Sequence, residues 1–292
     1  MTGDNTKSSS PEKSPYGKQS LLTYNNYLKV KELKTLQICE SQPSHHDEPL
    51  FIIIHQTYEL WFKLILHELD EVAALLEAGR ARRALWFLKR IVSIMRLLVG
   101  QIHILETMTP QDFLGFRNLL NPASGFQSSQ FREIEVACGL RDAALMEHFR
   151  NDEEAYASIK RRATSPSLQH HFYNLLRLRG FTMPELEETD VPRQLTPDDQ
   201  KQSEQFENER VQELRKLYEE TEKYGELYDI AESLVDLDEQ IFLWRMHHVT
   251  VVERIIGFKR GTGGSEGVGY LRSTLTKRCF PDLWKVRTEI RA

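Results

Sequence analysis

Helical periodicity sustained over long stretches is the feature that most constrains the fold of this chain. Apolar residues recur at spacings of three and four over residues 82–108 and 207–258, and neither stretch contains a proline. An α-helix brings such positions onto one face, whereas the period-two alternation that indicates strands is scarce in the sequence. The sequence therefore predicts an all-α fold, a bundle of long helices.

The composition argues against several classes of protein. The 292 residues carry a formal net charge of -5, so no basic surface for nucleic acid is expected. The three cysteines are far apart and form no CxxC, which argues against a disulfide framework, a zinc ribbon and covalent haem attachment. This cysteine usage predicts a cytoplasmic location. No apolar run approaches the roughly 18 residues that a membrane span needs, so no membrane partner is expected.

The chain is predicted to contain one folded domain. Residues 1–20 are rich in Ser, Lys and Pro, have no apolar core of a signal peptide and read as a disordered tail. Residues 21–292 form the predicted helical domain, which begins with a short amphipathic helix over residues 24–37. Residues 180–205 are acidic and contain prolines, which predicts a surface excursion.

Local signals predict where several helices begin and end. Asp47 is a suitable N-cap, and Pro49 is tolerated in the first turn that follows. Thr109 followed by a proline begins another helix, and Gly139 ends the one after it.

Two histidines lie on faces that should be buried. His55 is part of the apolar stripe of residues 46–69, and His248 follows Trp244 by four residues on the stripe of residues 238–258. His247, one position further round the helix, is expected to face polar groups. A histidine on an apolar face is most often a satisfied core residue. Two of them in an all-α chain without zinc spacing also suit a haem pocket, with one ring on the iron and one above it. The residues alone leave both interpretations open.

The glycine-rich stretch KRGTGGSEGVG, residues 259–269, invites a nucleotide-binding interpretation. It is not a Walker A motif, and it follows a helix rather than the strand of a Rossmann turn. It is either a helix stop with a flexible loop, or a loop whose backbone N–H groups and Thr262 hydroxyl close over an anionic group.

Several motifs in register resemble the tryptophan 2,3-dioxygenase family. They are YNNYL, HDEPLFIIIHQTYELWFK, ETMTPQDFLGFR, NPASGFQSSQFR and LWRMHHVTVVERIIGFKRGTGG, in the same order from about Tyr24 to the C-terminus. The resemblance implies an all-helical homotetramer with one haem b per subunit. It also implies insertion of both atoms of O2 across the indole C2–C3 bond of L-tryptophan, giving N-formylkynurenine.

The resemblance further implies roles for individual residues. His248 would be the proximal iron ligand with Trp244 beside it, and His55 would be the distal histidine that accepts the indole N–H. The other implied contacts are Phe51 at the indole, Phe113 and Arg117 at the substrate carboxylate, Thr262 at the amino-acid end, Ser124 and Gly125 at the haem edge, and Tyr24, Tyr27 and Leu28 reaching a neighbouring subunit's pocket.

Four positions depart from the family pattern. Phe113 stands where some bacterial members have Tyr, although animal-type members also have Phe. Ile102 and His103 stand where an aromatic residue and Ser are expected, and Glu266 replaces a smaller residue. These departures keep an alternative open, a haem monooxygenase of the same fold that inserts one oxygen into tryptophan or a β-substituted tryptophan. A non-catalytic haem sensor is less favoured, because it would have no reason to keep Arg117 and Thr262.

Overall fold

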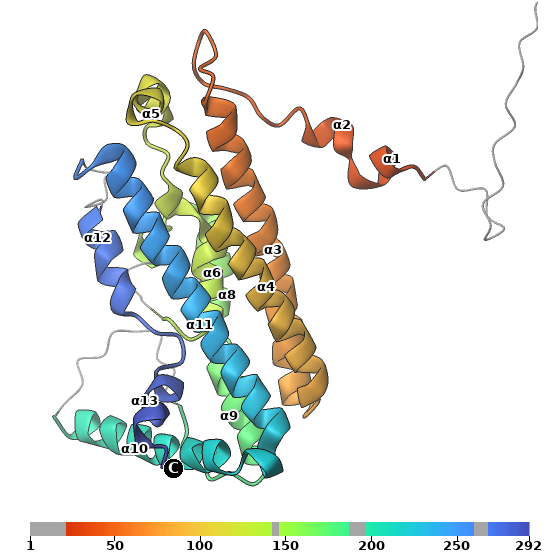
Figure 1. Ribbon diagram of the computed structural model, residues 1–292, viewed down its shortest axis with the longest axis vertical. Helices are drawn as coiled ribbons and strands as arrows, with labels where there is room; N and C mark the ends of the chain where they lie inside the picture. The colour runs from red at the N-terminus through yellow and green to blue at the C-terminus, as the bar shows by residue number, and fades with distance from the viewer. Residues whose placement is uncertain (1–21, 142–145, 187–196, 260–267, 292) are drawn as a thin grey trace, which may run out of the picture. The chain divides into compact units, whose positions relative to one another are not determined.

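The structure is a computed structural model that describes residues 22–141, 146–186, 197–259 and 268–291 (Figure 1). Within these residues every regular element is a helix, which confirms the predicted all-α class. The chain divides into two compact units, Met1–Cys39 and Glu40–Ala292.

The described part of the first unit holds two short helices, α1 (Tyr24–Leu28) and α2 (Val30–Leu33). The prediction of one continuous helix over residues 24–37 is wrong. Lys29 between them has a φ of 53°, a left-handed conformation that a helix cannot include and that periodicity does not reveal. Neither helix contains a buried residue.

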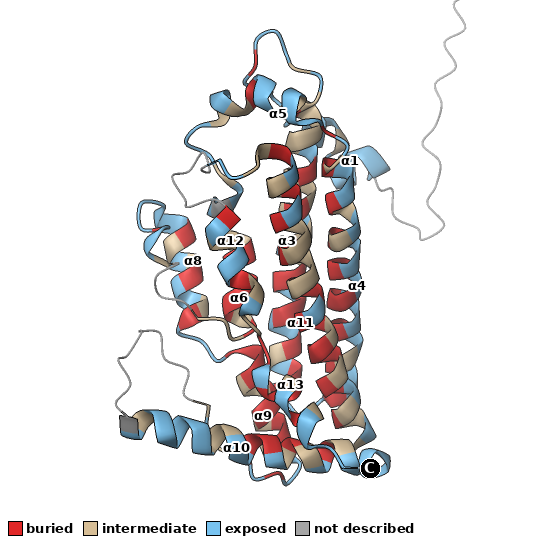
Figure 2. Ribbon diagram, turned by 60° about the vertical axis from the view of Figure 1, so that its left-hand side comes forward, coloured by how far each residue is buried: buried red, intermediate tan, exposed pale blue. Residues whose placement is uncertain are grey.

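Three long helices form the bundle of the second unit. They are α3 (Glu48–Glu77), α4 (Ala81–Leu105) and α11 (Thr221–Ile256), and α4 packs against both of the others (Figure 1). Their facing sides carry the buried residues (Figure 2). Ile65, Leu88 and Leu234, one from each helix, are fully buried in the same core. Apolar burial at this scale is the main stabilising term of such a bundle.

Shorter helices surround the bundle. They are α5 (Pro110–Arg117), α6 (Ser129–Ala137), α8 (Glu153–Ala163), α9 (Leu168–Leu178), α10 (Pro197–Glu219), α12 (Val268–Ser273) and α13 (Pro281–Glu289), with short 3-10 turns over Asn118–Leu120, Gly125–Gln127 and Thr274–Thr276. The predicted cap at Thr109 is confirmed, because its hydroxyl accepts the N–H of Asp112 at 3.2 Å. The predicted stop at Gly139 is also confirmed, and its φ of 109° favours glycine.

The start of α3 differs in detail from the prediction. The helix begins after Asp47 with Pro49 in its first turn, but the Asp47 side chain makes no capping hydrogen bond. The buried carboxylate of Glu48 instead accepts the backbone N–H groups of Glu40 at 2.6 Å and Ser41 at 3.1 Å. Glu48 therefore binds the preceding loop, and the side chain of Asp47 does not cap the start of the helix.

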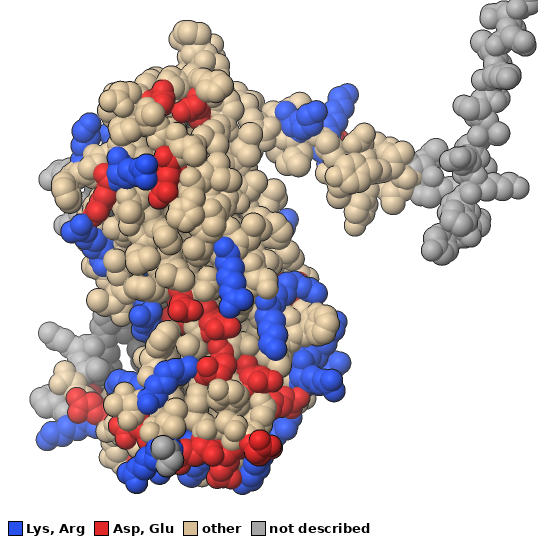
Figure 3. All heavy atoms as spheres, viewed as in Figure 1, with Lys and Arg blue, Asp and Glu red and all other residues tan. Residues whose placement is uncertain are grey.

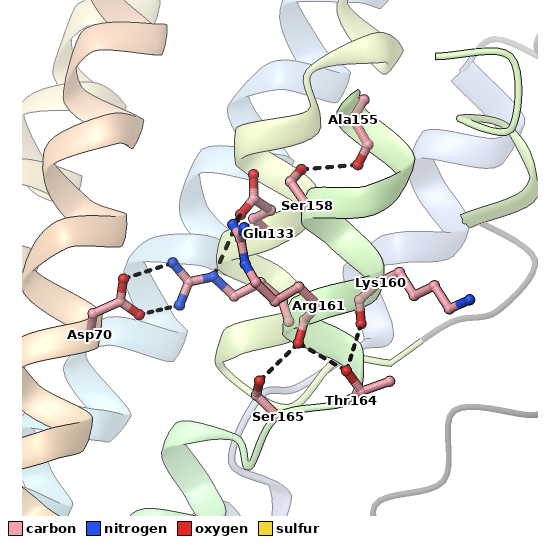
Figure 4. Close-up of polar contacts among 9 residues, drawn as sticks. Asp70, Glu133, Ala155, Ser158, Lys160, Arg161, Thr164 and Ser165 are labelled. Atoms are coloured by element: carbon pink, nitrogen blue, oxygen red, sulfur yellow. Dashed lines mark hydrogen bonds and ion pairs between the residues drawn. The ribbon is translucent and has the colours of Figure 1, made fainter. Parts of the chain in front are cut away.

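Charged side chains hold the shorter helices in place. Arg162 of α8 pairs with Asp70 of α3 at 2.9 Å and with Glu133 of α6 at 3.5 Å (Figure 4). Similarly, the buried Asp282 of α13 accepts hydrogen bonds from Tyr173 of α9 and Arg210 of α10. The contact of Arg162 with Glu133 fixes α6, which carries part of the cavity wall described below.

No single helix in the described residues is long and apolar enough to cross a membrane. One bent pair, Ala81–Leu105 with Pro110–Leu120, passes that test on length and composition alone.

Candidate active site

A cavity of about 500 Å3 lies within the second unit, between α3, α4, α5, α6, α11 and α12. Its volume lies in the range typical of pockets for cofactors and small ligands. Aromatic and aliphatic side chains make up most of its lining, among them Phe62, Leu105 and Val252. Both histidines that the sequence singles out, His55 and His248, face this cavity.

His55 enters the cavity from α3 as a neutral, oriented ring. Its Nδ1–H donates to the carbonyl of Phe51 at 2.7 Å, one helical turn earlier. Because Nδ1 carries the proton, Nε2 is left as an acceptor. Burial lowers the pKa of His55, which keeps the ring uncharged at neutral pH. The Phe51 ring lies 4.2 Å from the His55 ring, so the two side chains form one surface.

His248 enters the cavity from α11. Burial lowers its pKa to about 4, and the nearby His55 and Arg132 act in the same direction. A neutral imidazole is the form that binds a metal. Trp244, one turn earlier, stacks on His248 with ring centroids 5.1 Å apart and holds the orientation of the ring.

His247 points elsewhere, as predicted. Its ring meets that of His103 on α4 edge to face at 4.9 Å, and His103 Nδ1 lies 3.1 Å from the Glu106 carboxylate. Of the two adjacent histidines, only His248 lines the cavity.

The helix α5 supplies another wall of the cavity. Phe113 and Arg117, four residues apart, lie on the same side of α5 and both line the cavity. The Phe113 ring is 5.5 Å from that of Phe51, which connects this wall to His55. Ser124 and Gly125, which follow α5, line the cavity as well.

Eight residues with predicted roles thus meet at one cavity: Phe51, His55, Phe113, Arg117, Ser124, Gly125, Trp244 and His248. Ile102 also lines it. Thr262 and Glu266 lie outside the described residues. Tyr24, Tyr27 and Leu28 are exposed in the first unit.

A buried charged cluster at the cavity was not predicted. Glu135 of α6 accepts hydrogen bonds from Arg132 at 2.5 Å and from Nε of Arg245 at 3.1 Å. All three residues are buried and line the cavity. One signal was available in the sequence, because Arg245 lies between the apolar positions Ile241 and Val249 on α11. A charged residue on a buried stripe indicates a paired or functional charge.

The residues present fit a haem held without covalent attachment. His248 offers a neutral imidazole, the apolar walls suit a porphyrin, and Arg132 and Arg245 line the same cavity as possible partners for its carboxylates. No cysteine is found among the described cavity residues, so nothing there would form a thioether bond.

These features define an all-helical protein with a pocket suited to haem. The chain belongs to the tryptophan 2,3-dioxygenase family, whose sequence profile, described as "Tryptophan 2,3-dioxygenase", matches residues 10–186 and 201–290. As a member, it is a haem-dependent dioxygenase. Residues 187–200, which the profile leaves out, fall within the acidic segment predicted as an excursion.

Several relatives of this chain carry the name tryptophan 2,3-dioxygenase. The one from Myxococcus xanthus is 41% identical over 92% of this chain and 89% of its own length. The one from Serratia proteamaculans is 41% identical over 93% of this chain and 94% of its own. The one from Herpetosiphon aurantiacus is 43% identical over 92% of this chain and 98% of its own.

Proposed function

We propose that this protein cleaves the indole C2–C3 bond of L-tryptophan with O2, using haem b, to give N-formylkynurenine. Family membership supports the reaction. The structural observation that carries the proposal is the meeting of His55, His248 and Arg117 at one largely apolar cavity. Haem, when bound, supplies the activation of O2, and the protein supplies orientation and the exclusion of water.

We assign His248 to the iron and Trp244 to the support of its ring. The neutral state of His248 and its stacking on Trp244 favour this role. Ser124 and Gly125 would lie at the haem edge, since both line the cavity. The arginines of the Arg132–Glu135–Arg245 cluster would offer partners for the haem carboxylates, since they line the cavity together with His248.

We assign His55 and Phe51 to the indole ring. The Nε2 atom of His55 can accept the indole N–H, because its Nδ1–H is engaged by the Phe51 carbonyl. The Phe51 ring beside it offers an apolar face for the aromatic substrate. With its lowered pKa, His55 accepts this hydrogen bond without being protonated at neutral pH.

The amino-acid end of the substrate is assigned to α5 and the glycine-rich loop. Arg117 presents a planar guanidinium that can pair with both oxygens of a carboxylate. Phe113 adds an apolar contact but no hydroxyl group. Thr262, which lies outside the described residues, is proposed at the same end.

The protein is further proposed to be a cytoplasmic homotetramer, with residues 21–292 as one catalytic domain. Figure 3 shows charged side chains gathered over the lower part and the left edge of the view, and a broad uncharged area over the upper part of α4 and the neighbouring part of α11. On α4, Leu97 and Ile104 are seven residues apart and half exposed, as are Ile53 and Leu60 on α3. Such apolar faces suit subunit contacts. Tyr24, Tyr27 and Leu28 would then reach a neighbouring subunit's pocket.

Sedimentation equilibrium of the haem-loaded protein tests the assembly. The expected mass is about four times the 34.1 kDa of one chain, because the proposed assembly holds four copies. A stable monomer at micromolar concentration would contradict both the tetramer and the shared pocket.

The alternative of a one-oxygen product is not favoured, because the relatives are named as dioxygenases. The deciding experiment is turnover of L-tryptophan by the reduced, haem-loaded protein under isotopically labelled O2, followed by mass spectrometry. Both labelled atoms are expected in N-formylkynurenine. Haem-free protein serves as the control. A product with one labelled atom, or no conversion of L-tryptophan, would overturn the proposal.

A further inference from the structure

The loop before α3 makes an unusually close contact with α5. A Cβ placed on Gly115 would lie 2.8 Å from Nε2 and 2.9 Å from Cδ2 of His45. Real Cβ atoms are not found so close to other heavy atoms, so the His45 ring rests on the bare backbone of α5. Only glycine at position 115 allows this contact without a shift of either element.

The His45 ring is itself held firmly. The backbone N–H of His45 donates to the Ser41 hydroxyl oxygen at 2.7 Å, and the Ser41 hydroxyl donates to the buried Glu48 carboxylate. The N–H of Asp47 donates to Nδ1 of His45 at 3.3 Å, which fixes the orientation of the ring. The loop is therefore pinned to the first turn of α3, and its histidine is a rigid support.

The opposite side of α5 faces the cavity. Successive residues of an α-helix are about 100° apart, so Arg117 lies on roughly the opposite side of α5 from Gly115. Phe116, the one buried residue of this short helix, lies 5.4 Å from His45 and 5.8 Å from Phe51 by ring centroids. The helix is thus held between His45 on one side and the cavity wall on the other.

We infer that His45 is a positioning residue for substrate recognition: its ring on Gly115 sets the placement of α5, and thereby that of the Arg117 guanidinium at the substrate carboxylate. His45 does not line the cavity and would not touch the substrate. The inference rests on the proposed function, because it assumes that Arg117 binds the carboxylate of L-tryptophan.

The test compares a ligand that has a carboxylate with one that lacks it. Dissociation constants of L-tryptophan and tryptamine are measured on the haem-loaded protein from the change in haem absorbance. In His45→Ala, the constant for L-tryptophan is expected to rise about tenfold, since misplacement on the ångström scale costs this much or more. The constant for tryptamine should not change. In turnover, KM for L-tryptophan should rise more than kcat falls.

Gly115→Ala tests the same contact from the other side. It keeps His45 and adds a methyl group where the ring lies, so the same selective loss of L-tryptophan binding is expected. His46→Ala is the matched control, because that adjacent ring is 98% exposed and should behave as the wild type. The haem absorbance of each variant reports whether the pocket is intact.

The outcomes separate the inference from the function on which it rests. In one outcome, Arg117→Lys no longer binds L-tryptophan more tightly than tryptamine, while His45→Ala and Gly115→Ala bind L-tryptophan as the wild type does. The inference is then wrong and the proposed function stands. Equal weakening of both ligands in both variants would also overturn it, because the role would then be purely structural. If the wild type and Arg117→Lys show the same preference, the assignment of Arg117 fails, and the inference fails with it.

Discussion

Replacing His248 by alanine is expected to abolish haem binding, whereas replacing His247 should leave it intact. The two residues are adjacent on α11, but only His248 lines the cavity, while the His247 ring packs against His103 on α4. Burial keeps His248 neutral, so its nitrogen is available to iron without the loss of a proton. Removal of a sole protein ligand takes away the coordinate bond that anchors the group.

The measurement is the haem content of each purified variant after reconstitution, by absorbance of the haem–pyridine complex. His248→Ala should hold almost none, and His247→Ala should match the wild type. Far-ultraviolet circular dichroism shows whether both variants remain helical. Added imidazole, which fits the space left by the side chain, is expected to restore binding to His248→Ala alone. Full haem content with an unchanged spectrum in that variant would refute the assignment.

The long helices were predictable because their burial is periodic. The stripe that contains His55 also contains Tyr58 and Phe62, and both are buried as the pattern requires. The deviation at Lys29 was not predictable, because a lysine carries no signal for a left-handed backbone. Asp47 was a reasonable cap by residue type, but its side chain makes no capping hydrogen bond. The neighbouring Glu48 accepts two N–H groups of the preceding loop, a contact for which the sequence pattern has no signal.

The candidate site was predictable in part. Phe113 and Arg117 are four residues apart, so helical periodicity alone places them on one face. Contacts between distant segments leave no such signal. Gly115 is 70 residues from His45, and Glu135 is 110 residues from Arg245. Periodicity could show that Arg245 lies on a buried face, but it could not show which carboxylate balances it.

Loss of that carboxylate is expected to be among the most costly single changes in the protein. In Glu135→Gln the shape of the side chain is kept, but the buried Arg132 and Arg245 lose the carboxylate to which both donate hydrogen bonds. Breaking a buried ion pair in this way typically costs about 3–5 kcal/mol, because a stranded charge cannot regain its hydration. The free energy of unfolding, measured by urea denaturation of the haem-free protein, should fall by that amount.

Two further variants identify the cause of the loss. Glu147→Gln removes an exposed partner of Arg150, and the free energy of unfolding should fall by less than about 1 kcal/mol. Adding Arg245→Met to Glu135→Gln removes one of the two cations that lost the Glu135 carboxylate, so part of the lost stability should return, although the carbonyls of Thr274 and Lys277 then lose their donor. If the double variant is instead less stable than Glu135→Gln, Arg245 stabilises the cavity wall through those carbonyls and its packing, and the charge balance of the cluster is secondary.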